Sequence, residues 1–195
     1  MWKDLVLEAR SLACERGGRL VFKGLNFSVK SGEVLELRGP NGSGKSSLLR
    51  LLAGLNRPVD GVVIFNRDPA AEHAHYIGHL EAAKPALSVR ENLDFWASWL
   101  GGDASTALKP FRLERLADDE ARLLSEGQRR RLALSRLVAV KRPIWLLDEP
   151  TVGLDQTALA DLRREMTIHL DAGGMILAAT HAPLGLPALR ALELA

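Results

Sequence analysis

The sequence of 195 residues has little cysteine and no long apolar run, and each shortage excludes a class of protein. The single cysteine, Cys14, excludes an internal disulfide framework and a cysteine-based zinc site, which fits a reducing compartment. The longest apolar runs, LLRLLAGL at 48–55 and MILAAT at 175–180, fall far short of the roughly 20 residues that span a bilayer. The first ten residues, MWKDLVLEAR, include acids and predict no signal peptide. Any role at a membrane is therefore expected to depend on a partner.

The charged residues are balanced and give no reason to expect a nucleic-acid partner. Lys and Arg total 26 against 24 Asp and Glu, which leaves a net charge of +2 with both signs interspersed. With 47% hydrophobic and 26% charged residues, the chain has the composition of a folded globular protein that can bury one sizeable core. One run is unusual, because LSEGQRRRLALSRL at 124–137 places three consecutive arginines in a predicted helix. By itself this run leaves open a nucleic-acid patch or a solvated helix face.

The two ends of the chain predict an α/β core. Three strands are expected within residues 5–38, and a helix follows over 44–54. Further short strands are expected at 61–65, 73–78, 143–148, 174–180 and 190–195, with a helix over 156–171. The later strands are apolar without alternation and are separated by helices, which indicates a parallel sheet covered on both faces.

The middle of the chain predicts a helical insert. Its first helix begins with a capping box formed by Ser88 and Glu91, a second helix is expected near 105–117, and the arginine-rich helix comes last. We therefore expect one domain over 1–195. Its core is expected at about 1–80 and 141–195, and its helical insert at about 85–140.

The segment GPNGSGKS at 39–46 matches the phosphate-loop pattern G-x-x-x-x-G-K-[ST], directly after a predicted strand and before a predicted helix. The glycines let the backbone wrap closely around a polyphosphate, and the N–H groups that follow point at it from a helix N-terminus. Lys45 is expected to neutralise the β and γ phosphates, and the Ser46 hydroxyl to bind Mg²⁺. The ATP-binding residues expected here are Gly39, Pro40, Asn41, Gly42, Ser43, Gly44, Lys45, Ser46 and Ser47.

A second motif, IWLLDE at 144–149, is an apolar strand that ends in two acids. The strand would hold Asp148 and Glu149 at the carboxyl edge of the sheet, where ligands bind in open α/β folds. In a phosphate-loop ATPase the first acid typically holds Mg²⁺, and the second orients or deprotonates the attacking water. An isolated Asp-Glu pair is often only a strand end, but a phosphate loop about 100 residues earlier favours the functional interpretation.

With both motifs, the chain resembles the ATP-binding subunit of the ABC transporters over nearly its whole length. LSEGQ at 124–128 is one residue away from that family's LSGGQ signature. The resemblance implies a phosphate-loop NTPase core with an N-terminal antiparallel β subdomain and an inserted α-helical subdomain. It also implies a head-to-tail homodimer in which Ser125, Gly127 and Gln128 contact ATP held by the second copy. A hydroxyl, a glycine and a helix N-terminus suit a phosphate.

Other family positions carry roles by the same resemblance. His181, in ATH, resembles the switch histidine that acts beside Glu149 and Lys45 in catalysis, and GLD at 153–155 resembles the dimer-contact loop. Arg131 and Arg136 fall on family positions, whereas Arg129 and Arg130 are expected at the solvated surface. In the family the neighbourhood of Phe95, Trp96 and Trp99 forms a groove for a permease helix, but these residues also suit a packed core of the insert.

Two family positions are altered. The glutamine that usually senses Mg²⁺ is missing, since the only glutamines are Gln128 and Gln156, and its place is taken by His79. A neutral imidazole could bind the ion or its water, or His79 could simply be packed or solvated. The aromatic residue that usually stacks on adenine is replaced by Arg16, whose guanidinium could stack on a purine or lie in an exposed loop.

The runs YIGHLEAAKPALSVRENL at 76–93 and GGMILAATHAPL at 173–184 resemble the haem-exporter ATPases of bacterial cytochrome c maturation. This implies ATP and Mg²⁺ as ligands, integral membrane permease subunits as partners and a peripheral position at the cytoplasmic face of the inner membrane. Haem would be handled by the partners, because the chain has no Cys-x-x-Cys-His. Alternatives are an ABC ATPase for another substrate, an ABC protein that acts on DNA or ribosomes, and a small-metabolite kinase. A protein that acts on DNA or ribosomes usually has long coiled coils or two cassettes, whereas this chain has one cassette and no coiled coil. A small-metabolite kinase would not explain LSEGQ.

Overall fold

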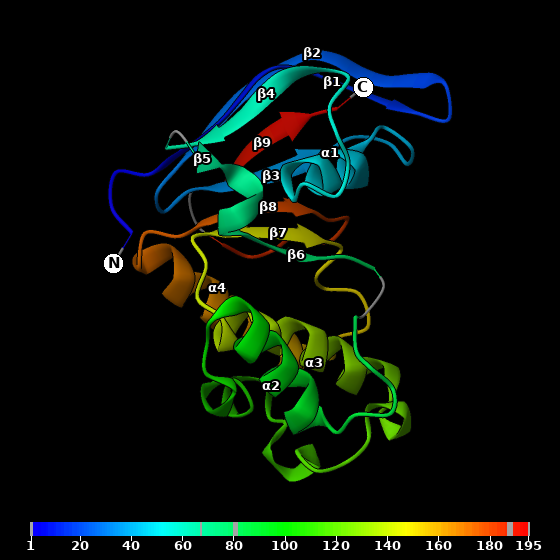
Figure 1. Ribbon diagram of the computed structural model, residues 1–195, viewed down its shortest axis with the longest axis vertical. Coiled ribbons are helices and arrows are strands. Elements are labelled where there is room, and N and C mark those ends of the chain that lie inside the picture. Colours follow the sequence, from blue (N-terminus) through cyan, green and yellow to red (C-terminus); the bar gives the residue numbers. More distant parts are fainter. Residues whose placement is uncertain (1, 67, 80–81, 187–188, 195) are drawn as a thin grey trace. The chain divides into compact units, whose positions relative to one another are not determined.

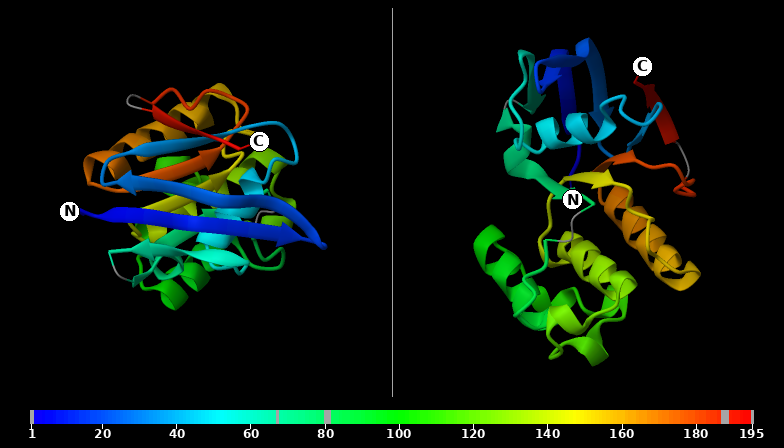
Figure 2. Two further views of the ribbon diagram at one scale, coloured as in Figure 1. Left: turned by 90° about the horizontal axis from the view of Figure 1, so that it is seen from above. Right: turned by 90° about the vertical axis from the view of Figure 1, so that its right-hand side faces the viewer.

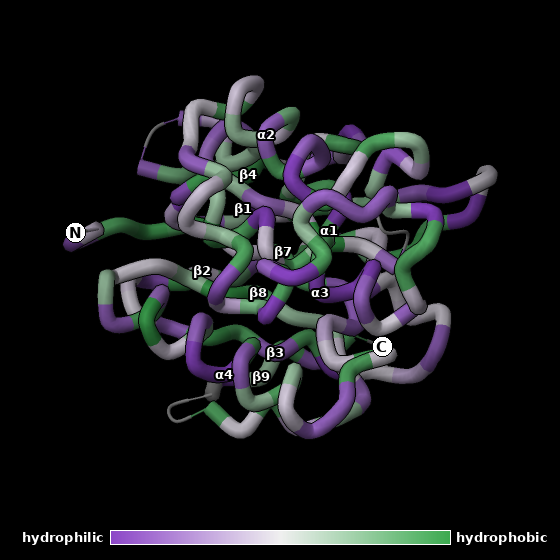
Figure 3. The backbone as a smooth tube through the Cα atoms, turned by 90° about the horizontal axis from the view of Figure 1, so that it is seen from below, coloured by the Kyte–Doolittle hydropathy of each residue, from purple (hydrophilic) through white to green (hydrophobic). Residues whose placement is uncertain are grey.

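The computed structural model describes residues 2–66, 68–79, 82–186 and 189–194. The chain divides into two compact units (Figure 1). The first contains Met1–Gly78, Arg142–Pro150 and Ile168–Ala195, and the second contains His79–Lys141 and Thr151–Thr167. Hydrophobic and hydrophilic stretches alternate along the chain (Figure 3), and among the described residues no helix has the length and apolar character needed to cross a membrane.

The first unit contains an antiparallel sheet with the strand order β2-β1-β4-β5. Its strands are β1 (Val6–Arg16), β2 (Arg19–Lys30), β4 (Asp60–Phe65) and β5 (Asp68–Pro69), and the longer ones run side by side in Figure 2. A tight turn joins β1 to β2 through Gly17 and Gly18, whose φ angles are +56° and +76°. Two consecutive positive φ values are what a two-residue hairpin turn requires, and glycine adopts them without steric cost.

The first unit also contains a sheet with the order β6-β7-β8-β3-β9, in which all neighbouring strands are parallel. The strands are β3 (Val34–Arg38), β6 (Ala74–Ile77), β7 (Ile144–Asp148), β8 (Met175–Ala179) and β9 (Leu189–Glu193). Every residue of β7 and β8 is buried, as expected for strands that read as continuous apolar runs. The α/β fold class, the parallel sheet and the antiparallel N-terminal part predicted from the sequence are confirmed.

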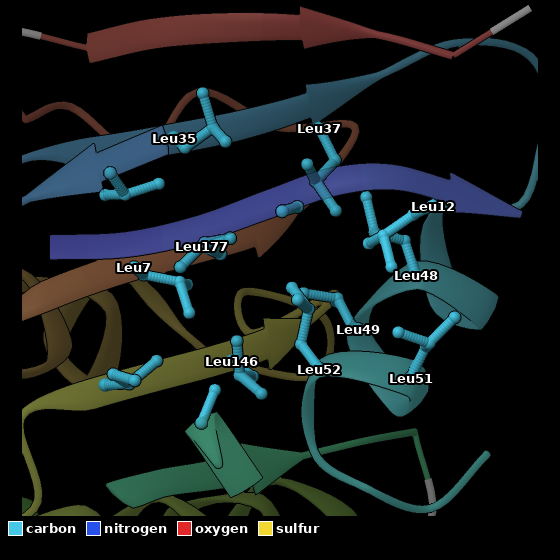
Figure 4. Packing of buried hydrophobic residues seen from close by; sticks show 14 of the residues in the cluster. Leu7, Leu12, Leu35, Leu37, Leu48, Leu49, Leu51, Leu52, Leu146 and Leu177 are labelled. Atoms are coloured by element: carbon cyan, nitrogen blue, oxygen red, sulfur yellow. The ribbon is translucent and has the colours of Figure 1, made fainter. Parts of the chain in front are cut away.

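Helix α1 (Lys45–Leu52) packs into the core between these strands (Figure 4). Leu48, Leu49 and Leu52 are at most 2% exposed and belong to one cluster with Leu7 of β1 and Leu146 of β7. Each fully buried leucine contributes about 2 kcal/mol. The start of α1, and with it the loop that precedes it, is therefore fixed against the sheet.

The second unit is mainly helical. It contains α2 (Val89–Leu100), α3 (Glu126–Ala139), most of α4 (Gln156–Asp171) and four short 3-10 turns, at Ala104–Thr106, Lys109–Phe111, Glu114–Leu116 and Ala121–Leu123. The capping box at the start of α2 is confirmed, because Ser88 Oγ accepts from Glu91 N at 3.2 Å and the Glu91 carboxylate accepts from Ser88 N at 2.7 Å. The predicted helix near 105–117 is wrong. Pro110 has no N–H, and Arg112 has a φ of +54°, so these residues form separate turns.

A buried histidine lies in the first unit at the end of α4. The ring of His169 stacks on Trp145 of β7 with centroids 3.9 Å apart, and its Nε2 lies 3.2 Å from the carbonyl oxygen of Met175. Burial lowers the pKa of His169 from 6.5 to about 4. The folded protein therefore holds this ring neutral over a pH range in which the unfolded chain protonates it.

We predict that His169 makes the protein less stable in acid. Between pH 6.5 and 4 the unfolded chain binds the extra proton, so the free energy of unfolding should fall by about 2 kcal/mol from pH 7 to pH 5 through this residue. Urea unfolding at both pH values measures the drop. His169→Gln keeps a planar N–H donor but does not titrate, so its drop should be smaller by that amount. Equal drops in both proteins would contradict the assignment.

Candidate nucleotide site

The phosphate loop connects β3 to α1. Gly44 caps the helix with a φ of +98° and a ψ of +9°, and α1 begins at Lys45. Because Gly44 has no side chain to cap the helix, the N–H groups of the first turn are available to an anion. The glycines predicted to shape this loop thus stand where a tight backbone path requires them.

Two of these glycines are needed for close packing. A Cβ on Gly39 would lie 2.2 Å from the carbonyl oxygen of Leu194, and a Cβ on Gly44 would lie 2.5 Å from Cγ1 of Val21. The same Cβ would lie 3.2 Å from the ring of Phe22. The loop is therefore held against β2, a contact that nothing in the sequence around Val21 or Phe22 indicates.

Two polar side chains of the loop suit a polyphosphate. Lys45 is 8% exposed, and its Nζ donates to the carbonyl oxygens of Gly39 and Pro40 at 2.7 and 2.9 Å. The hydroxyl of Ser43 is buried and finds no hydrogen-bond partner among the described residues. A buried hydroxyl without a partner is costly, and a phosphate oxygen would satisfy it.

The predicted metal ligands Ser46 and Asp148 are brought together. The Ser46 hydroxyl donates to Oδ1 of Asp148 at 3.0 Å, and Asp148 is 1% exposed. A hydroxyl and a carboxylate are hard oxygen ligands that suit Mg²⁺, which usually completes its coordination with phosphates and waters. The described residues contain no group of three or more His, Cys, Asp and Glu that could hold a metal ion.

Sequence reasoning missed two residues that lie behind this pair. The Tyr76 hydroxyl of β6 donates to Oδ2 of Asp148 at 3.3 Å, and Arg50 Nε of α1 donates to the Tyr76 oxygen at 3.3 Å. Burial, and then the negative charge of Asp148, raise the pKa of Tyr76, while its hydrogen bond to Arg50 opposes the shift. The hydrogen bond to Tyr76 raises the pKa of Arg50. The only available signal was the i, i+4 spacing of Ser46 and Arg50, which places them on one helix face.

Glu149 and His181 are also brought together. Oε2 of Glu149 accepts from the backbone N of His181 at 3.3 Å, and Nε2 of His181 lies 3.5 Å from Oε1. Glu149 has a φ of +50°, which is costly for a residue with a side chain and is often retained at functional sites. Its side chain is 11% exposed, whereas that of His181 is 62% exposed. The carboxylate is thus held in place while the imidazole can still meet a ligand.

A cavity of about 530 Å³ lies beside the phosphate loop in the first unit. Its lining joins the ends of β3 and β8 to the segment after β8, and includes Arg38, Gly39, Lys45, Thr180, His181 and Leu184. Arg16 lies at the end of β1, in the hairpin whose second strand carries Val21, and it is exposed. Stacking of Arg16 on a purine stays a prediction.

In the second unit, the LSEGQ segment forms the start of α3. Ser125 Oγ accepts from Gln128 N at 3.3 Å, and Oε1 of Gln128 accepts from Ser125 N at 2.7 Å. A Cβ on Gly127 would lie only 3.0 Å from the carbonyl oxygen of Gly153, so the GLD segment packs directly on the helix start. Asp155 of that segment accepts from Ala158 N at 2.7 Å in the first turn of α4. The LSEGQ and GLD segments therefore lie side by side.

The arginines of α3 correct one expectation. Arg130 is 4% exposed, so its predicted place at the solvated surface is wrong. Arg129 is only partly exposed and donates to the carbonyl oxygen of Leu124, and Arg131 donates to that of Phe111 at 3.1 Å. Arg136 lies 3.8 Å from the centroid of the Trp96 ring, and burial lowers its pKa to about 10. The arginine run packs within the chain, and sequence reasoning missed this because the pattern does not show which helix faces are covered.

Trp96 and Trp99 border a groove of about 780 Å³, lined also by Ala82, Lys84, Phe95 and Ser98. Trp99 is 69% exposed and Phe95 is 41% exposed, so of the two interpretations the groove is favoured over a fully packed core. His79 lines a different cavity of the second unit, together with Glu126 and Arg129. Asp148 belongs to the first unit, and a metal-binding role for His79 stays a prediction.

Comparisons with known proteins show the family of the chain. The family model described as ABC transporter matches residues 22–152. The chain is 51% identical to the "Cytochrome c biogenesis ATP-binding export protein CcmA" of Rhodopseudomonas palustris (strain BisB5), over 96% of each chain. It is 47% identical to the protein of the same name from Paramagnetospirillum magneticum (strain ATCC 700264 / AMB-1), over 98% of this chain and 94% of that protein.

Solved structures support the same fold. A putative ABC transporter ATP-binding protein from Pyrococcus furiosus superposes with a TM-score of 0.83 over 97% of both chains, at 23% identity. CbiO1 from Clostridium perfringens, described as part of the ABC transporter complex CbiONQ, superposes with a TM-score of 0.75 at 27% identity, over 92% of this chain and 80% of that one. The ATP-binding cassette MJ0796, a dimer with ADP and Pi, superposes with a TM-score of 0.76 at 24% identity, over 90% and 88%.

We predict that Gly44→Ala destabilises the protein by at least about 2 kcal/mol more than Gly42→Ala. Both glycines have a positive φ, +98° and +87°, which costs an alanine about 1 kcal/mol. Only Gly44 would also clash with Val21, because a Cβ on Gly42 meets nothing within 4 Å. Urea unfolding measures both variants. Val21→Ala should recover part of the lost stability in the Gly44→Ala background but not in the Gly42→Ala background. Equal losses of stability in Gly44→Ala and Gly42→Ala would contradict the packing argument.

Proposed function

This chain belongs to the ABC transporter family, and we propose that it is the ATP-hydrolysing subunit of an exporter for cytochrome c biogenesis. The observation that carries the ATPase chemistry is the pairing of Glu149 with His181 beside the phosphate loop. The biological assignment is supported by relatives named as cytochrome c biogenesis export proteins, which cover nearly the whole chain at about half identity. In this proposal MgATP binding and hydrolysis drive haem export or delivery.

The loop binds the polyphosphate. The N–H groups at the start of α1 and the buried Ser43 hydroxyl donate to phosphate oxygens. Lys45, released from the carbonyl oxygens of Gly39 and Pro40, neutralises the β and γ phosphates. Ser46 and Asp148 hold Mg²⁺, which when bound neutralises charge on the phosphates.

Glu149 acts on the attacking water. The carboxylate accepts a proton from the water while the water oxygen bonds to the γ phosphorus. The bond from that phosphorus to the oxygen that bridges it to the β phosphate breaks, and the products are ADP and phosphate. His181, whose Nε2 lies 3.5 Å from Glu149, keeps the carboxylate in register and donates to the γ phosphate. The strained backbone of Glu149 fits a role in which position matters more than stability.

Two copies of the chain complete the site. We propose a head-to-tail homodimer with ATP at the interface, in which Ser125, Gly127 and Gln128 of one copy contact the nucleotide of the other. The capping box fixes the helix start, and its partial positive charge favours a phosphate. His79 takes the role of the family's missing glutamine, and Arg16 that of the adenine-stacking residue.

The core and its helical insert at about 85–140 form one cassette in this proposal, and the insert meets the membrane partner. The groove beside Phe95, Trp96 and Trp99 receives a permease helix of the cytochrome c maturation system. The subunit then lies at the cytoplasmic face of the bacterial inner membrane, and the partners handle haem. The second candidate is an ABC exporter for a different substrate, since nothing in the nucleotide site specifies the cargo.

We predict that Glu149→Gln lowers the ATPase rate at least about 100-fold while ATP affinity is kept, because only the base is lost. The ATP-bound dimer should then accumulate and be visible by size-exclusion chromatography with MgATP. Glu8→Gln, which changes a partly exposed carboxylate of β1 that pairs with Arg10, is the matched control and should leave both rate and size unchanged. Hydrolysis by Glu149→Gln at the parent rate would mean that another group is the base.

The same variant tests the partners. Glu149→Gln with MgATP should capture membrane subunits of the cytochrome c maturation system from detergent-solubilised membranes of the native organism, as identified by mass spectrometry. Trp99→Glu in the same background places a charge in the groove and should abolish the capture while the ATP-bound dimer still forms. Capture of an unrelated permease would keep the ATPase mechanism and exclude the cytochrome c assignment.

A further inference from the structure

Four side chains from three elements of the first unit form a chain of hydrogen bonds at the proposed metal site. Ser46 and Arg50 lie one helical turn apart on α1, Tyr76 lies on β6, and Asp148 ends β7. Ser46 contacts Oδ1 of Asp148, Tyr76 contacts Oδ2, and Arg50 contacts Tyr76, at 3.0, 3.3 and 3.3 Å. The two carboxylate oxygens therefore face different partners, one on the phosphate loop and one on the neighbouring strand.

The direction of each hydrogen bond is fixed. An arginine only donates, so the Tyr76 oxygen accepts from Arg50 and its proton points to Asp148. A tyrosine hydroxyl, whose ordinary pKa is about 10, keeps its proton at neutral pH. Tyr76 is thus a fixed donor to Oδ2. The hydrogen bond between Ser46 and Oδ1 can instead be given up, so that both atoms bind a third partner.

The backbone makes room for the tyrosine. β6 and β7 are parallel with Tyr76 opposite Leu146, which brings the phenol across to the end of β7. Two residues later, a Cβ on Gly78 would lie 2.9 Å from the Tyr76 hydroxyl and 3.0 Å from its ring carbon. Since real Cβ contacts are rarely that short, any other residue at 78 would displace the phenol.

We propose that Tyr76, braced by Arg50, is a positioning residue for the Mg²⁺ site: it holds Oδ2 of Asp148 so that Oδ1 and Ser46 are presented to the metal. The inference rests on the proposed function, because it assumes that Ser46 and Asp148 bind the ion. Outer partners that orient a ligating carboxylate typically change metal affinity by about 10- to 100-fold. Tyr76 itself does not touch nucleotide or metal in this arrangement.

Tyr76→Phe removes only the hydroxyl. In the full-length protein, we expect the affinity for ATP in EDTA to stay within about twofold of wild type, because the phosphate loop is unchanged. The gain in ATP affinity on adding Mg²⁺ should fall by about tenfold. Isothermal titration with and without Mg²⁺ measures both, and direct Mn²⁺ binding in the presence of ADP, followed by electron paramagnetic resonance, gives a readout independent of activity.

Two further variants separate positioning from stability. Ser31→Ala removes the hydroxyl that accepts from Leu5 N, elsewhere in the first unit, so it should lower thermal stability without changing the Mg²⁺ gain. Arg50→Lys keeps the charge but not the planar donor, so its Mg²⁺ gain should lie between those of wild type and Tyr76→Phe.

An unchanged Mg²⁺ gain in Tyr76→Phe would overturn the inference, as would equal losses with and without Mg²⁺. A wild-type protein whose ATP affinity does not respond to Mg²⁺ would instead contradict the proposed function, and the inference would fall with it.

Discussion

The hydrogen bond between Ser46 and Asp148 joins two motifs that lie 102 residues apart, and much of the first unit serves to make it possible. Ser46 lies on α1, which follows β3, and Asp148 ends β7. β3 and β7 are not neighbours, because β8 lies between them in the sheet. Helix α1 bridges this gap, and its buried leucines hold it in one register against the strands. A rotation of α1 by one residue, about 100°, would carry Ser46 away from Asp148. The hydrophobic core is therefore also what sets the geometry of the polar site.

The second constraint is the left-handed backbone at Glu149. In a regular strand, consecutive residues point to opposite faces, so Asp148 and Glu149 could not both serve one site if β7 continued. The φ of +50° at Glu149 ends the strand and redirects its side chain, at a cost of about 1–2 kcal/mol. Its N–H to Ala179 and its carboxylate contact with His181 offset part of that cost. The backbone strain and the proposed catalytic role thus fall on one residue. Its N–H donates to Ala179 at the end of β8, and its carboxylate accepts from His181 just after that strand.

Local patterns predicted the fold and most of the site, and long-range contacts explain the rest. The phosphate loop, the Asp-Glu pair and the capping box of α2 are set by residues a few positions apart, so the sequence shows them directly. Tyr76 and Val21 act through partners far away in the sequence, and nothing in their own neighbourhood marks them. Arg130 was expected at the surface because the resembled family often has glutamine at this position, and its burial depends on neighbours that only the fold supplies. At Pro110 a local rule, the missing N–H, outweighed the helical pattern around it.

In the proposed dimer, one group at the start of α3 would serve both a structural contact and a ligand contact. A hydroxyl can accept and donate at once, so Ser125, which accepts from Gln128 N, still has its proton for a phosphate oxygen. The capping box thereby orients the hydroxyl and leaves its proton available for donation. Gly127 adds a second effect, because a Cβ at this position would lie only 3.0 Å from the Gly153 carbonyl oxygen, so the GLD segment packs directly against the helix start. In the proposed dimer, a nucleotide that displaced Ser125 would therefore act on residues 153–155 through this direct packing contact.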